Sequence, residues 1–251
     1  TDPAKVKAIH HQGRFYQSDG VFQVMPSIQR TPVLFQAGAS AKGLAFATQH
    51  AEAIFIGGGE KSAIKRQVET IRQLAKAQGR NPNDIKVLMG ITVVTDKRHD
   101  LAQAKLAEYE GYASSEAGLA HYSSSVGIDL SQYADDEVIA YQQTNSIASV
   151  NQRFRQQVTK AQLIAEHRLG GRYPLIVGDG REVAEALITW VDETGIDGFN
   201  VTRTVTPESY EDFIQYVIPE LQRRGRFKTE YKQGSLRHKL IGKGERLPSS
   251  H

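Results

Sequence analysis

Cysteine is absent from the 251 residues of the chain, tryptophan occurs once and methionine twice. Without thiols the chain can form neither a disulfide framework nor a thiolate metal site, and this composition favours a reducing compartment. No apolar stretch approaches the roughly 18 residues that cross a bilayer. We therefore expect a cytoplasmic protein with no membrane partner. The first residues, TDPAKVKAIHHQ, have neither an initiating methionine nor the pattern of a signal peptide, and we interpret the chain as a fragment or a processed form.

Positive charge is concentrated near the end of the sequence. The formal net charge is +3, from 31 lysines and arginines and 28 acidic residues. Residues 222–246 contain nine of the basic residues and two of the acidic ones, which leaves 22 basic and 26 acidic residues elsewhere. A basic segment of this kind can bind nucleic acid. Because apolar residues are interleaved with these charges, we interpret the tail, about residues 225–251, as docking on its own domain or on a protein partner, with no nucleic acid involved. The interleaved residues are Phe227, Tyr231, Leu236 and Leu240.

Apolar runs and helical patterns alternate along much of the chain. The runs do not alternate between apolar and polar residues, which is typical of parallel strands covered on both faces. About four βα units result, and they fit either half of an eight-stranded (β/α)8 barrel or an open doubly wound sheet. Strands are predicted at residues 31–38, 52–58, 85–95 and 196–204, and helices at residues 41–51, 61–78, 179–195 and 206–225.

The segment from residue 97 to residue 175 interrupts this order. Residues 99–113 predict a helix, residues 121–138 a loop, and residues 147–168 one long helix without a strand of its own. The βα order resumes near Leu175. We interpret residues 114–175 as a helical insertion on a βα connection, where barrels form substrate pockets and lids. The whole chain, residues 1–251, is predicted to be a single α/β domain.

The turn after the first apolar run is the strongest candidate site. Gly38 permits a sharp bend and Ser40 is a suitable N-cap, while the following helix offers unpaired N–H groups and a positive dipole end, which together can hold a phosphate. The alternative is that the glycine only makes a tight turn and the serine only caps a helix. Three further glycines at residues 57–59 indicate a backbone that passes close to a ligand or to its own neighbours.

Stricter catalytic motifs are absent. GASAKG has Lys42 where a nucleophile elbow requires glycine, GGGEKS has Glu60 where a phosphate loop requires its second glycine, and no G-x-G-x-x-G precedes a helix. No metal-ligand cluster and no pair of carboxylates with acid–base spacing emerges, so no metal site is predicted. His50 lies in a helix beside apolar residues and is interpreted as structural. His121 lies in the insertion next to Tyr122 and a run of serines, where it is either a pocket donor or a structural residue.

Several longer segments carry a family resemblance. SIQRTPVLFQAGASAKGLAFATQHAEAIFIGG, HHQGRFY, HYSSSVGIDLSQY, TGIDGFNV and VIPELQRRGRFKTEY resemble the flavin-dependent monooxygenases of the bacterial luciferase superfamily. The most similar branch contains long-chain alkane monooxygenase, nitrilotriacetate monooxygenase component A and dibenzothiophene sulfone monooxygenase. The resemblance runs from Thr1 to about Lys243 and matches the C-terminal part of those longer chains. It implies that the α/β fold is the C-terminal part of a (β/α)8 TIM barrel with a helical insertion.

The resemblance also implies an activity and a site. Family members use reduced FMN, delivered by a separate flavin reductase, to activate O₂ and oxidise a small organic substrate, here with a long-chain alkane as one candidate. Ala37, Gly38, Ala39 and Ser40 correspond to the loop that contacts FMN, and His121 corresponds to a catalytic pocket histidine.

Three functions follow from these observations. The first is the C-terminal portion of an FMN-dependent monooxygenase, incomplete as an enzyme on its own. The second is a non-catalytic flavin-binding or assembly half-barrel subunit. The third, an isomerase or aldolase of the phosphate-binding barrel type, is disfavoured because no catalytic lysine or carboxylate is evident at a strand end. A half barrel exposes strand edges and an apolar face, so we expect a homo-oligomer.

Overall fold

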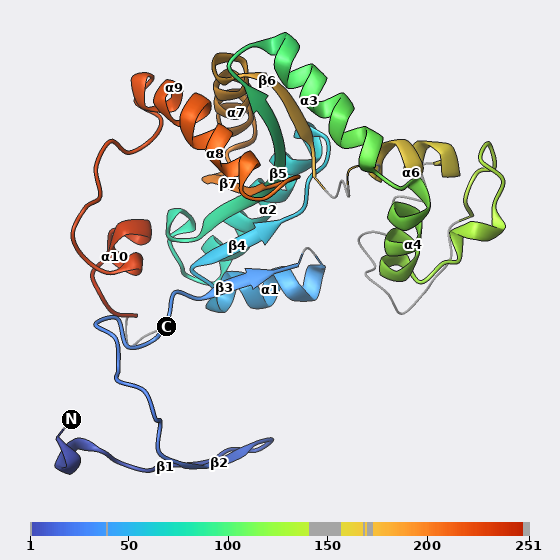
Figure 1. Ribbon diagram of the computed structural model, residues 1–251. Coiled ribbons are helices and arrows are strands. Elements are labelled where there is room, and N and C mark those ends of the chain that lie inside the picture. The colour runs from blue at the N-terminus through green and yellow to red at the C-terminus, as the bar shows by residue number, and fades with distance from the viewer. Residues whose placement is uncertain (1, 39, 141–156, 168, 170–172, 248–251) are drawn as a thin grey trace. The chain divides into compact units, whose positions relative to one another are not determined.

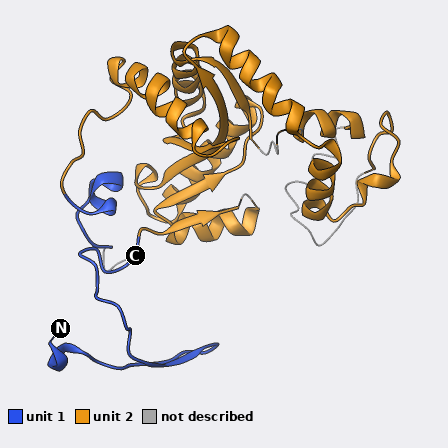
Figure 2. Ribbon diagram, in the orientation of Figure 1, with its two compact units in different colours: residues 1–32, 234–251 blue, residues 33–233 orange. Residues whose placement is uncertain are grey.

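The computed structural model describes residues 2–38, 40–140, 157–167, 169 and 173–247. The chain divides into two compact units (Figure 2). Unit 1 comprises Thr1–Pro32 and Gly234–His251, and unit 2 comprises Val33–Gln233. The single domain expected from the sequence stays a prediction, because the structure describes the two units separately. None of the helices in the described ranges is long and apolar enough to cross a membrane.

Unit 2 is built on a parallel five-stranded sheet (Figure 1). The central strand β5 pairs with β4 along residues 86–89, with β7 along residues 88–92 and with β6 along residues 92–96. β3 pairs with β4. The parallel sheet and the four predicted strands are therefore confirmed, and β6 begins at the residue where the βα order was expected to resume. The strands are β3 (Phe35–Ala37), β4 (Ala53–Ile56), β5 (Lys86–Asp96), β6 (Leu175–Asp179) and β7 (Gly198–Thr202).

Helices cover one face of this sheet. Alternate residues of a strand point to opposite faces, and the odd-numbered residues 87, 89, 91 and 93 of β5 are buried in one apolar core with side chains of α2 and α7. The even-numbered residues of β5 therefore belong to the opposite face, which we call the second face. The helices of the core are α1 (Ala41–His50), α2 (Lys61–Ala77), α7 (Gly180–Thr194) and α9 (Ile218–Arg223), and α8 (Glu208–Asp212) precedes α9.

The stripe predicted for the second helix is confirmed, and the last helix has an irregular middle. In α2 the buried residues are Ile64, Val68, Ile71 and Ala75. Between α8 and α9 lies a π-helical segment, Phe213–Val217. Pro219 follows it in the first turn of α9. A proline at this position needs no N–H partner, which is why the helical path continues past it with a change of winding.

The predicted insertion is partly different from expectation. Helix α3 (His99–Tyr112) forms as predicted, but α4 (Ser115–Val126) includes residues 121–126, which the sequence predicted as loop, so the loop prediction is wrong for those residues. Ser114 caps α4 by accepting a hydrogen bond from the Ala117 N–H, and Gly127 ends it in the left-handed conformation with φ 68°. A small second core then buries Tyr122 and Val126 against residues that include Leu163.

The long helix predicted for residues 147–168 is interrupted. Residues 147–156 and Arg168 lie outside the described residues, and α6 (Lys160–His167) is the described part of the segment. Thr159, directly before it, forms an antiparallel bridge with Val138. The prediction of one continuous helix is therefore wrong at Thr159.

The described part of unit 1 contains a short antiparallel hairpin, a 3-10 turn at Pro3–Lys5 and one short α-helix. Strand β1 (Ile9–Gln12) pairs with β2 (Gln17–Gly20), and α10 (Leu236–Ile241) belongs to the same unit. Arg237 is 2% exposed, and its guanidinium donates to the carbonyl oxygens of Gln29 and Pro32 at 3.3 and 2.8 Å. Part of the basic tail is thus buried within unit 1.

Candidate functional site

The turn between β3 and α1 has the local geometry that the sequence predicts. Gly38 has φ 124°, a backbone conformation that residues with a side chain rarely adopt, and a Cβ added there would have no heavy atom within 4 Å. The glycine is needed for its conformation and not for space. Ser40 caps α1, since its Oγ accepts a hydrogen bond from the Gly43 N–H at 3.1 Å. Ala37 is the exposed last residue of β3, and Ala39 lies outside the described residues.

This turn fits an anionic ligand. The N–H groups of Ala41 and Lys42 have no intrahelical acceptor, because they belong to the first turn of α1. The hydroxyl of Ser40 uses its oxygen as the cap acceptor and keeps its hydrogen for donation. Together with the positive end of the helix dipole, these groups can bind phosphate oxygens.

The glycines after β4 allow a close approach of the chain to itself. A Cβ added to Gly58 would lie 2.1 Å from Cδ of Pro174, whereas Gly57 and Gly59 have nothing within 4 Å. Of the two interpretations drawn from the sequence, the structure supports contact with a neighbouring segment for Gly58.

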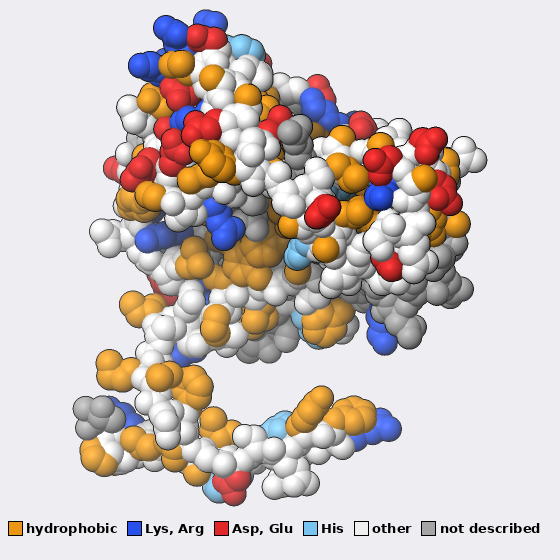
Figure 3. Space-filling model, turned by 45° about the vertical axis from the view of Figure 1, so that its right-hand side comes forward, with side chains coloured by type: hydrophobic (Ala, Val, Ile, Leu, Met, Phe, Trp, Pro, Cys, Tyr) orange, Lys and Arg blue, Asp and Glu red, His pale blue; other side chains and the backbone are white. Residues whose placement is uncertain are grey.

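The second face of the sheet combines aromatic rings with polar side chains. The rings of Phe35 and Phe55 stack with centroids 5.2 Å apart. Thr92 of β5 pairs with Thr202 of β7, and Gly90 pairs with Asn200, which is exposed. Hydrophobic side chains gather in a hollow of the molecular surface in the space-filling view (Figure 3). A mostly apolar surface with a few polar groups is typical of small-molecule sites.

A charged cluster lies at the carboxyl end of β5. Lys105 Nζ of α3 is 3.0 Å from Asp96 Oδ2 and 2.5 Å from Asp212 Oδ2. Glu208 Oε1 lies 3.7 Å from the same amine, and Glu208 Oε2 accepts a hydrogen bond from the Tyr109 hydroxyl at 2.5 Å. The cluster therefore joins α3, β5 and α8.

Burial and pairing shift the pKa values in this cluster. Burial lowers the pKa of the Lys105 amine, but the hydrogen bonds to Asp212 and Asp96 outweigh it, so the pKa is raised. Burial, followed by the hydrogen bond to Glu208, raises the pKa of Tyr109. Burial raises the pKa of Asp96, but the hydrogen bond from Lys105 outweighs it and the pKa is lowered. These shifts keep Lys105 protonated, Tyr109 neutral and Asp96 ionised at neutral pH, and we assign the cluster a structural role.

His121 lies on helix α4, not in a loop. Its side chain is exposed, and its carbonyl oxygen accepts a hydrogen bond from the Ser125 hydroxyl at 3.2 Å. No hydrogen bond between described residues joins it to the β3–α1 turn. Its role as a pocket histidine stays a prediction.

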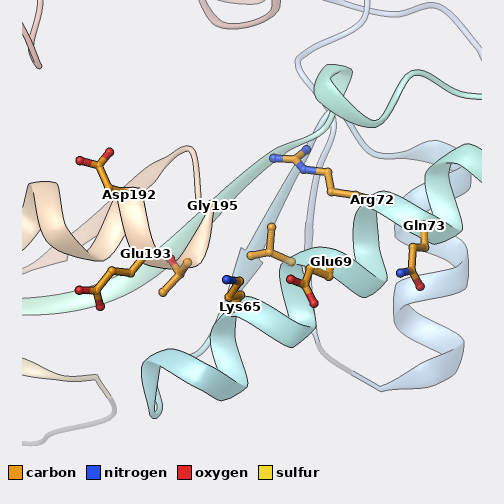
Figure 4. A pocket seen from close by; sticks show the side chains of 9 residues that line it. Lys65, Glu69, Arg72, Gln73, Asp192, Glu193 and Gly195 are labelled. Atoms are coloured by element: carbon orange, nitrogen blue, oxygen red, sulfur yellow. The ribbon is translucent and has the colours of Figure 1, made fainter.

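A surface groove of about 480 Å³ lies between α2 and the end of α7 (Figure 4). Arg72, on its wall, donates to Asp197 at 2.6 Å, and Asp197 accepts the Val87 N–H at 2.8 Å. These contacts lie at the amino ends of β5 and β7, the end of a βα barrel that is associated with stability and not with catalysis. The side chains around the groove include Lys65, Glu69, Gln73, Asp192 and Glu193. No group of His, Asp or Glu in the described ranges has the arrangement of a metal site.

Comparison with known proteins decides between the two sheet architectures. Residues 5–231 match the family described as Luciferase-like monooxygenase. The chain belongs to this family. Its sheet is accordingly the C-terminal part of a luciferase-like (β/α)8 barrel, as predicted, and the open doubly wound alternative is excluded.

The family members that resemble the chain differ in their names. The chain is 41% identical over 253 residues to a long-chain alkane monooxygenase of Geobacillus thermodenitrificans and 41% identical over 257 residues to a dimethyl-sulfide monooxygenase of Hyphomicrobium sulfonivorans. Each match covers 100% of this chain and 54% of the relative. A solved riboflavin lyase with modified FMN and riboflavin superposes with a TM-score of 0.87 at 34% identity, covering 100% of this chain and 56% of that one. The chain thus spans about half the length of the relatives it matches.

Barrel enzymes bind their ligands at the carboxyl edge of the barrel strands. In this chain, a ligand is therefore expected at that edge. The structure brings Gly38 and Ser40 together at that edge. The second face and the Lys105 cluster were not predicted from the sequence. The available signal for the cluster was the spacing of Lys105 and Tyr109 on one face of a helix directly after a strand that ends in Asp96.

Proposed function

We propose that the chain is the C-terminal part of a monooxygenase that depends on reduced FMN and O₂ and obtains the flavin from a separate reductase. The observation that carries this proposal is the β3–α1 turn of a luciferase-like family member, with Gly38 at φ 124° and Ser40 as the cap of α1. The structural similarity to a riboflavin lyase with modified FMN supports a flavin as the ligand. The names of the relatives do not favour the alternative of a non-catalytic subunit.

The residues at the turn would hold the phosphate of FMN. The N–H groups of the first turn of α1 and the hydroxyl of Ser40 are the donors, and Gly38 gives the chain its bend. Ala37 and Ala39 complete the proposed contact loop. The bound flavin would supply the electrons that activate O₂. His121 is proposed as the polar group of the substrate side of the pocket.

The substrate is proposed to be a small organic molecule. The two relatives with equal identity are named for an alkane and for dimethyl sulfide, so identity does not choose between these substrates. A long-chain alkane stays one candidate, supported by the apolar aromatic pair Phe35 and Phe55 on the second face.

We also propose that the protein works as a homo-oligomer. In the described part of the chain, β3 pairs only with β4, and β6 and β7 each pair only with β5. These three strands therefore offer unpaired backbone groups, and further strands or a second copy would satisfy them.

Flavin titration tests the proposal. FMN and riboflavin, which lacks the phosphate, are titrated against the purified chain and against the variants Ser40→Ala and Ser114→Ala. Ser114 is the matched control, because its hydroxyl caps α4 as Ser40 caps α1. We expect FMN to bind more tightly than riboflavin. Ser40→Ala should weaken the binding of FMN and leave the binding of riboflavin unchanged. The absence of FMN binding at high micromolar flavin, or equal effects of both variants, contradicts the proposed site.

A further inference from the structure

Two consecutive side chains, Tyr173 and Pro174, occupy space that glycines leave open. A Cβ added to Gly90 in β5 would lie 2.2 Å from two ring atoms of Tyr173, and a Cβ added to Gly58 would lie 2.1 Å from Cδ of Pro174. Both distances are far below van der Waals contact, so neither glycine can be replaced without moving the ring against it. The segment is also fixed by its backbone, since the Pro174 carbonyl accepts the Thr92 N–H at 2.9 Å.

The tyrosine ring lies on the second face of the sheet. Val87, Met89 and Ile91 are buried against the helices, so Gly90, between two of them, belongs to the opposite face. The ring rests directly on the backbone of β5 there. On the neighbouring strand β7, the residue paired with Gly90 is Asn200, whose side chain is exposed.

The Tyr173 ring stays partly accessible in this arrangement. Tyr173 is only half-buried and belongs to neither of the two apolar cores. An aromatic ring is here seated on the bare backbone of β5, beside the exposed amide of Asn200 on the neighbouring strand. An aromatic ring and an amide are the groups that bind a planar heteroaromatic molecule, the first by its face or edge and the second through hydrogen bonds to the polar rim.

We propose that Tyr173, seated on Gly90, contacts the isoalloxazine ring of the flavin. This inference rests on the proposed function and adds the part of the site that binds the ring, whereas the β3–α1 turn binds the phosphate. Asn200 is the adjacent donor and acceptor for the polar edge of the same ring. Tyr173 is a binding residue in this proposal and takes no part in bond making.

The test separates ring binding from phosphate binding. FMN and riboflavin are titrated by flavin fluorescence against the wild-type chain, Tyr173→Ala, Tyr173→Phe and Gly90→Ala. Tyr112→Ala is the matched control, because Tyr112 is a tyrosine of the same unit that is 85% exposed. We expect Tyr173→Ala to raise the Kd about 3- to 10-fold, and equally for both flavins, because the ring is common to them.

The other variants identify the contact. Tyr173→Phe keeps the ring and should bind as the wild type does, with less quenching of the flavin fluorescence because the electron-rich phenol is gone. Gly90→Ala displaces the ring and should weaken the binding of both flavins as Tyr173→Ala does. The double variant Gly90→Ala/Tyr173→Ala should show no further loss of affinity. Far-UV circular dichroism checks that each variant folds, and the two Tyr173 variants decide the question if Gly90→Ala does not fold.

The outcomes distinguish the two proposals. If the wild type binds flavin and the Kd of Tyr173→Ala equals that of Tyr112→Ala, the role of Tyr173 is overturned. The proposed function is then left intact. A loss confined to FMN in Tyr173→Ala overturns the ring contact as well, because riboflavin shares the ring. A wild-type chain that binds neither flavin overturns the flavin site of this chain and the ring contact together.

Discussion

Removal of the Lys105 charge is expected to destabilise unit 2 strongly. In the wild type the Lys105 side chain is 13% exposed, and the side chains of Asp96 and Asp212 are 19% and 15% exposed. Replacement by methionine keeps the length of the side chain but leaves two largely buried carboxylates without their cation. Breaking a buried pair in this way typically costs about 3–5 kcal/mol, and the residual solvent contact here reduces the expected cost to about 2–4 kcal/mol.

Trp190 provides the assay for this prediction. It is the only tryptophan and lies on α7 of unit 2, so its fluorescence during urea unfolding reports on that unit. With a slope of about 2–3 kcal/mol per molar urea, Lys105→Met should lower the unfolding midpoint by about 1 M. The double variant Lys105→Met/Asp212→Asn should recover part of the loss, because it removes one of the unpaired charges.

The control and the pH dependence make the prediction refutable. Arg98 directly precedes α3 and pairs with Asp100 in its first turn, and their side chains are 63% and 66% exposed. Arg98→Met removes this ion pair and should leave the midpoint unchanged. Because the pKa of Asp96 is lowered, its stabilising contribution is present above its unfolded pKa, near 4, and is lost as the pH falls through the folded value. The difference between wild type and Lys105→Met should therefore narrow in acid. Equal midpoints for Lys105→Met and Arg98→Met at pH 7 would refute the reasoning.

Two further predictions concern a glycine and a histidine. Gly38→Ala should destabilise unit 2 by about 1–3 kcal/mol in the same urea assay, because φ 124° strains any residue with a Cβ; Gly57→Ala is the control, and equal effects would contradict the conformational argument. The pKa of His99 is raised, first by its hydrogen bond to Glu182, so this pair stabilises the fold below the unfolded pKa near 6.5 and the contribution is lost as the pH rises through the folded value. Glu182→Gln should lower the pKa of His99 towards its ordinary value in an NMR titration, and an unchanged pKa would show that the contact is absent in solution.

The fold was predictable where one local pattern determined it. Strand β4 is apolar throughout and β5 is mostly apolar between Lys86 and Asp96, while α2 has apolar residues at helical spacing, so period and length alone identify them. Helix α4 was not predictable in this way, because three consecutive serines and a histidine obscure its pattern. It is determined instead by the cap at Ser114, by Gly127 and by two side chains that become buried only in the folded insertion.

The candidate site was predictable only where it is local. Gly38 and Ser40 are neighbours in the sequence, so their turn could be derived from residue type. Lys105 and Asp212 are 107 residues apart, and no spacing rule connects them. The same holds for Tyr173 and Gly90, which meet because the segment before β6 returns to β5.

Three glycines have different physical roles at the same sheet. Gly38 is needed for its backbone conformation, Gly58 for the approach of Pro174, and Gly90 for the seat of an aromatic ring on the second face. The first role concerns the turn that we propose for the phosphate, and the third concerns the surface that we propose for the flavin ring. The helix-covered face of β5 has no such positions, because its residues are filled by aliphatic side chains that stabilise the barrel. We therefore expect the charge of Lys105, which joins α3, β5 and α8, to affect unfolding, and the ring of Tyr173, which lies on the second face, to affect the proposed flavin affinity.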